Sequence, residues 1–139
     1  MDKGRALILT ILQIANEKNI LLSKTKLQKL VFLVQKELGR EYFRFVPYKY
    51  GPWSEDLVRE VERMAEEGIV EIEKIESSTF YRLKVQAQKD KDFVRYVEKY
   101  IVLPLEYLLA LIYAEYPEMT ELSEIREKVK EFQRWYGLG

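Results

Sequence analysis

The order of the predicted elements in the first 86 residues constrains the fold most. A Gly51-Pro52 pair separates an aromatic extended segment from the helix after it, and such a pair forces a turn. The hydrophobic periodicity predicts these elements in turn: a helix over 3–18, a helix from Thr25 to Leu38, an extended segment over 42–50, a helix over 55–67, and strands over 69–75 and 81–85. Thr25 and Gln28 fit a capping box at the start of the second helix, Gly39 ends that helix, and Ser54 is the predicted N-cap of the third. Helix, turn, helix and hairpin is the order of a winged helix-turn-helix domain.

The helix over 54–67 would occupy the DNA groove in such a domain, but its charge opposes that role. It carries six carboxylates and two arginines, a formal charge of −4. Proteins that read DNA gather positive charge where they meet the phosphates. The conflict between scaffold and charge favours a protein partner over DNA.

The composition narrows the chemistry further. The chain has no cysteine and no histidine, which excludes disulfides, thiol chemistry and zinc held by Cys or His ligands. The formal net charge is zero, which argues against a strongly cationic nucleic-acid binder. A charged fraction of 33%, mostly Glu, Lys and Arg, resembles the usage of hyperthermophile proteins and predicts a thermophilic source.

The start of the chain could be mistaken for a signal peptide. Its apolar run is interrupted by Thr10 and Gln13 and passes directly into a polar segment, so an amphipathic helix is the better interpretation. No segment approaches the roughly 18 apolar residues of a membrane span. We therefore expect a cytoplasmic protein that does not enter a membrane.

The second half of the chain returns to a helical period. We expect an α+β, mainly α protein, with a winged-helix-like domain over 1–86, a small hairpin wing, and a helical extension over 88–139 packed on it as one compact unit. A very apolar helix over 105–116 and a heptad-like seam over 122–136 predict a homodimer through the C-terminal helices. The sequence leaves open whether these helices cover their own domain or a second subunit.

Nothing in the sequence predicts an enzyme. Ser23 and Lys26 match S-x-x-K, but the further motifs of serine acyl enzymes are missing. The paired carboxylates lie on helix ends or exposed strands, where they are normally solvated. We predict no catalytic residue, no metal site and no cofactor.

The turn after the extended segment is the predicted interaction site. Tyrosine and tryptophan at a fixed turn are typical anchors of protein interfaces, although they could equally pack one helix on another. Together with the acidic helix, they would meet a basic protein partner. The predicted partner-binding residues are Tyr48, Tyr50, Gly51, Pro52, Trp53, Glu55, Asp56, Arg59, Glu60 and Arg63.

A different interpretation places nucleic acid on the second helix and the aromatic segment. Basic side chains interleaved with aromatic ones can follow a nucleic-acid backbone. A transcription regulator of this kind would bind DNA through Lys24, Lys26, Lys29, Arg44 and Lys49. The same lysines could simply keep the surface solvated.

Two segments of the chain carry a family resemblance. They read Lys26-Leu27-Gln28-Lys29-Leu30-Val31-Phe32-Leu33 and Tyr48-Lys49-Tyr50-Gly51-Pro52-Trp53-Ser54. Over residues 5–75 the chain resembles the YwgA-like proteins, whose function is largely unassigned, and through them the SocA-like (Panacea) antitoxin domains. The resemblance implies a winged-helix-like module without catalytic residues that binds another protein, such as a toxin.

Overall fold

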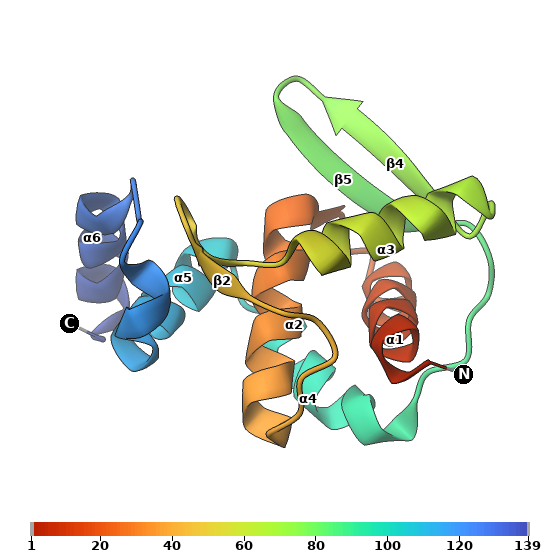
Figure 1. Ribbon diagram of the computed structural model, residues 1–139, viewed down its shortest axis with the longest axis horizontal. Helices are drawn as coiled ribbons and strands as arrows, with labels where there is room; N and C mark the ends of the chain where they lie inside the picture. Colours follow the sequence, from red (N-terminus) through yellow and green to blue (C-terminus); the bar gives the residue numbers. More distant parts are fainter. Residues whose placement is uncertain (1, 139) are drawn as a thin grey trace.

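The computed structural model describes residues 2–138. Figure 1 shows the N-terminal helices with a projecting hairpin, and the last helices of the chain at the opposite end of the molecule. The elements are α1 (Lys3–Glu17), β1 (Leu22–Ser23), α2 (Lys24–Leu38), β2 (Val46–Tyr48), β3 (Gly51–Trp53), α3 (Glu55–Glu66), β4 (Val70–Ile75), β5 (Ser78–Leu83), α4 (Lys91–Ile101), α5 (Leu105–Glu115), a 3-10 turn η1 (Pro117–Thr120) and α6 (Arg126–Tyr136).

A three-stranded antiparallel sheet joins the wing to the helices. Its order is β1-β5-β4, with Leu22 opposite Tyr81 and Val70 opposite Leu83. No strand is predicted from the sequence at β1, which is only two residues long and forms a strand because β5 pairs with it. With this sheet, the predicted α+β, mainly α fold with a hairpin wing is confirmed.

The start of α2 differs from the predicted one. We expected Thr25 and Gln28 to form a capping box. This prediction is wrong, because the hydroxyl of Ser23 accepts the hydrogen bond from the backbone N–H of Lys26, 3.0 Å away. Gln28 is thereby free to point out of the helix. The predicted end is confirmed, since Gly39 takes the left-handed conformation with φ of 65°.

The extended segment forms a second, smaller hairpin from β2 and β3. The predicted turn at Gly51-Pro52 is displaced, because the chain reverses at Lys49 and Tyr50 and the Gly-Pro pair lies in β3. Ser54 then begins α3 as expected, its hydroxyl accepting a hydrogen bond from the N–H of Leu57. Hairpin and helix therefore follow one another without a linker.

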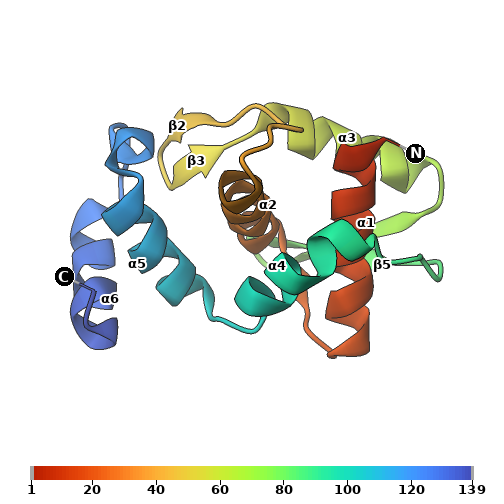
Figure 2. The same cartoon turned by 90° about the horizontal axis from the view of Figure 1, so that it is seen from below.

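The C-terminal helices pack on the rest of their own chain. α4 begins at its cap Asp90 and lies against α1 and α2, and α5 lies against α2. Figure 2 shows α5 and α6 side by side at the end of the molecule far from the N-terminus. Leu108 and Ile112 of α5 are fully buried, so α5 covers its own domain. Among residues 2–138 no helix is long and apolar enough to span a membrane.

Candidate interaction site

The side chain of Gln28 in α2 holds the hairpin of β2 and β3 in place. Gln28 is buried, and its amide nitrogen donates to the carbonyl oxygen of Ser54 at 2.9 Å. The N–H of Ser54 donates in turn to the side-chain oxygen of Gln28 at 2.8 Å. The side chain of Gln28 thus pairs with both the N–H and the C=O of Ser54, as a neighbouring strand would, just after the end of β3.

Lys29 makes the second attachment. Its side chain has no exposed surface, and its Nζ donates to the carbonyl oxygen of Pro52 at 2.9 Å. The same ammonium lies 5.9 Å from the ring centroid of Trp53. Burial lowers the pKa of Lys29 to about 7, because the interior disfavours the charged form.

The third attachment comes from the C-terminal part of the chain. Gly51 has a φ of 89°, and a Cβ atom there would lie 3.2 Å from Cε1 of Tyr113 in α5. The hydroxyls of Tyr113 and Ser123 lie 2.6 Å apart, which fixes the ring. At the tip of the hairpin the N–H of Glu124 donates to the carbonyl of Lys49 at 2.7 Å. The hairpin is therefore held from both sides.

The outward side of this hairpin is aromatic. Tyr48 and Tyr50 are 42% and 40% exposed, and the half-buried Trp53 lies 5.9 Å from Tyr48 between ring centroids. The ammonium of Lys49 sits 5.6 Å and 5.7 Å from the two tyrosine rings, and that of Lys24 sits 5.8 Å from Trp53. Rings and cations together form a rigid, amphipathic surface.

No protein-family model matches the chain, and no curated protein matches its sequence. The resemblance to YwgA-like and SocA-like proteins therefore stays a prediction. The two segments that carry it are in direct contact in this structure. Gln28 and Lys29, from the first segment, bond directly to Ser54 and Pro52, from the second. In this chain the first segment therefore holds the hairpin that contains most of the second.

The face of α3 next to the hairpin is acidic, but fewer of its side chains are available to a partner than the sequence predicts. Glu55, Asp56 and Arg59 are exposed, and Glu55 accepts a hydrogen bond from the indole of Trp53 at 3.0 Å. Glu60 is buried between Arg5 at 2.6 Å and Arg63 at 2.7 Å. The placement of Glu60 among partner contacts is thus wrong, because it joins α1 to α3. Gly51 and Pro52, also predicted as partner contacts, are buried within β3.

The structure brings only some of the predicted nucleic-acid residues to the surface. Lys29 is enclosed, which contradicts its assignment as a phosphate contact. Lys26 is half-buried, donates to the carbonyl of Ile101 at 2.7 Å, and has a pKa lowered by burial. Arg44 is exposed, whereas Lys24 and Lys49 lie over aromatic rings. These cations do not form one continuous basic track along α2.

Over residues 2–138, no three His, Cys, Asp or Glu side chains lie together as ligands for an ion. The carboxylates of α3 point to solvent, to arginine or, in the case of Glu55, to the indole of Trp53. The hairpin surface is therefore the site that the geometry favours.

Proposed function

We propose that this protein is a non-enzymatic, winged-helix-like interaction module that binds another protein through the β2–β3 hairpin and the start of α3. The observation that carries the proposal is the anchored hairpin with its exposed tyrosines. Aromatic side chains on a surface fixed before binding are effective interface anchors, since little conformational entropy is lost on association.

The charge next to the hairpin suggests the kind of partner. Glu55 and Asp56 are exposed at the N-terminal end of α3, and Glu62 and Glu66 continue the acidic surface. A basic partner segment would be steered towards this face and would lay its apolar residues on the tyrosines. The resemblance to SocA-like antitoxin domains supports an antitoxin-like or regulatory adaptor, with a toxin as one form of the partner.

The decisive experiment compares capture of partners by wild-type protein and by a Tyr48→Ala/Tyr50→Ala variant, followed by affinity measurement on the partner identified. We expect affinity to fall about tenfold or more, because two interface anchors are lost. Tyr96→Ala, a half-buried tyrosine on α4, is the matched control and leaves affinity unchanged. Equal affinity of the double variant and the wild type would contradict the proposed site.

Self-association is a separate part of the proposal. On α6 only one side is covered: Val129 is buried, whereas Trp135 is 67% exposed, and Leu122 in the loop before α6 is 64% exposed. A second copy could cover this surface. Sedimentation at micromolar concentration would then give a dimeric mass that Trp135→Ala reduces. A monomeric mass for the wild type would refute it.

DNA binding is tested in parallel with labelled random duplex DNA. With Lys29 buried and α3 acidic, we expect no binding even at low salt. Micromolar binding that weakens steeply as salt is raised would replace the proposed function with the regulator interpretation.

A further inference from the structure

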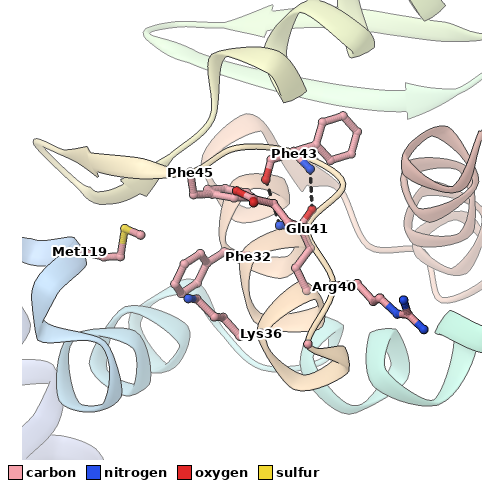
Figure 3. Close-up of a pocket in the computed structure, with 9 residues that line it drawn as sticks. Phe32, Lys36, Arg40, Glu41, Phe43, Phe45 and Met119 are labelled. Carbon is pink, nitrogen blue, oxygen red and sulfur yellow. Dashed lines mark hydrogen bonds between the residues drawn. The ribbon is translucent and has the colours of Figure 1, made fainter.

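A pocket of about 280 Å³ lies beside the hairpin and plays no part in its attachment. It opens between the C-terminal half of α2, the loop over 40–45 and η1 (Figure 3). Its volume is just below the range of roughly 300 to 1,000 Å³ that is typical of ligand sites, so only a small ligand would fit. Its apolar lining is made by Phe32, Phe45 and Met119, whereas the ring of Phe43 points away from them (Figure 3).

The walls of this pocket are formed before any ligand arrives. Gln35 holds the loop with three hydrogen bonds, accepting from the N–H groups of Tyr42 and Phe43 and donating to the carbonyl of Phe43. The ring of Phe32 packs edge-on against that of Phe45, with 5.4 Å between centroids. A ligand would therefore lose little affinity to ordering the protein.

Two exposed side chains of opposite charge, Lys36 and Glu41, line the pocket. Lys36 places its Nζ 5.5 Å from the ring centroid of Phe32 and 5.6 Å from that of Tyr116. Within the described part of the chain, neither Lys36 nor Glu41 takes part in an ion pair. In Figure 3 the guanidinium of Arg40 points away from the other labelled side chains.

We propose that this pocket binds a free α-amino acid with an apolar side chain. The apolar side chain would lie on Phe32, Phe45 and Met119, the carboxylate would meet Lys36, and the ammonium would meet Glu41. A simple anion would be repelled by Glu41 and a simple cation by Lys36. A zwitterion satisfies both charges.

The test is a titration followed by amide chemical shifts, with L-phenylalanine as the probe. Two analogues each lack one charge: 3-phenylpropionate has no ammonium, and phenethylamine has no carboxylate. We expect L-phenylalanine to shift the signals of residues 32–45 and Met119, and to bind about threefold or more tightly than either analogue, the range expected of exposed charge pairs.

Two variants give a crossed pattern that a merely structural role would not produce. Lys36→Met should weaken the binding of L-phenylalanine and 3-phenylpropionate but not that of phenethylamine. Glu41→Gln should weaken the binding of L-phenylalanine and phenethylamine but not that of 3-phenylpropionate. Lys128→Met, an exposed lysine of α6, is the control. No shift at millimolar L-phenylalanine overturns the site, and equal binding of 3-phenylpropionate overturns the amino-acid assignment.

Discussion

The two hairpins of this protein are stabilised in different ways. The wing, β4 and β5, has six residue pairs from Val70–Leu83 to Ile75–Ser78 and projects away from the helices (Figure 1). The β2–β3 hairpin has three pairs, and one of them sets Pro47 opposite Pro52. Proline has no N–H to donate, so this pair contributes no ladder hydrogen bond.

The smaller hairpin therefore depends on side chains from outside it, and the wing does not. Gln28, Lys29 and Tyr113 hold the smaller one from α2 and α5. On the wing, exposed ion pairs of Arg82 with two glutamates accompany a complete ladder. Because the β2–β3 hairpin depends on these side chains, α2 and α5 set its position. Such a hairpin is suited to present a rigid surface.

The largest effect should follow from Gln28→Ala, which removes the support of β3. Two buried backbone groups of Ser54 would lose their partners, so we expect a loss of about 2–4 kcal/mol in the free energy of unfolding. Chemical denaturation measures it, with the exposed Gln86→Ala as the control. A loss no greater than that of the control would show that the hairpin supports itself.

Lys29 should make stability depend on pH. Its pKa is about 7 in the fold and returns towards the ordinary 10.5 on unfolding. Below pH 7 both states carry the proton; above it only the unfolded chain does, so the free energy of unfolding rises with pH by roughly 1.4 kcal/mol per unit.

Lys29→Met should remove this slope between pH 7 and about 9, a range below the ordinary pKa of lysine. Urea denaturation at several pH values gives the slopes of the two proteins. Lys128→Met keeps the wild-type slope as the control. The same slope in Lys29→Met as in the wild type would contradict the assignment.

A pair of glycine variants compares the hairpins directly. Gly51 precedes Pro52 in β3, and Gly68 precedes the wing; both have positive φ, at 89° and 79°. Alanine is strained at either position, but only at position 51 would its Cβ meet another residue, Tyr113. Gly51→Ala should therefore cost about 1 kcal/mol more than Gly68→Ala in thermal denaturation. Equal costs would mean that the Tyr113 contact does not constrain the hairpin.

The smallest effect is expected on the wing. Arg82→Ala breaks its ion pairs with the exposed Glu71 at 4.0 Å and the partly exposed Glu73 at 3.5 Å. Such pairs contribute little, so the loss should stay below about 0.5 kcal/mol. A loss as large as that of Gln28→Ala, measured by the same denaturation, would erase the contrast between the hairpins.

The helices could be predicted because their signals are local. Ser54 before a carboxylate pair, Asp90 before α4 and Gly39 after α2 each act within one turn of the helix end. The cap of α2 was misassigned because Ser23 and Thr25 are both suitable residues two positions apart. The local sequence does not distinguish these two residues as caps. Gln28 cannot complete a capping box with Thr25, because its side chain bonds to both backbone groups of Ser54, which is distant in the sequence.

The signal for the hairpin fastening was present but ambiguous. Gln28 and Lys29 are polar residues between Leu27 and Leu30, in a helix that is buried from Leu27 to Gln35. Polar side chains within such a buried segment require partners. From the sequence alone, Lys29 is expected to be a surface cation. The periodicity of a helix does not reveal how much of its surface the neighbouring elements cover.

The sequence by itself determined the helices, the wing and the acidic charge of α3, since periodicity, caps and charge act over a few residues. Tertiary structure decided which polar residues are exposed: Lys29 and Glu60 are enclosed, and Tyr48 and Tyr50 reach solvent. The physical reason is that a buried charge or a proline-interrupted strand is stabilised only by groups that folding brings from elsewhere in the chain.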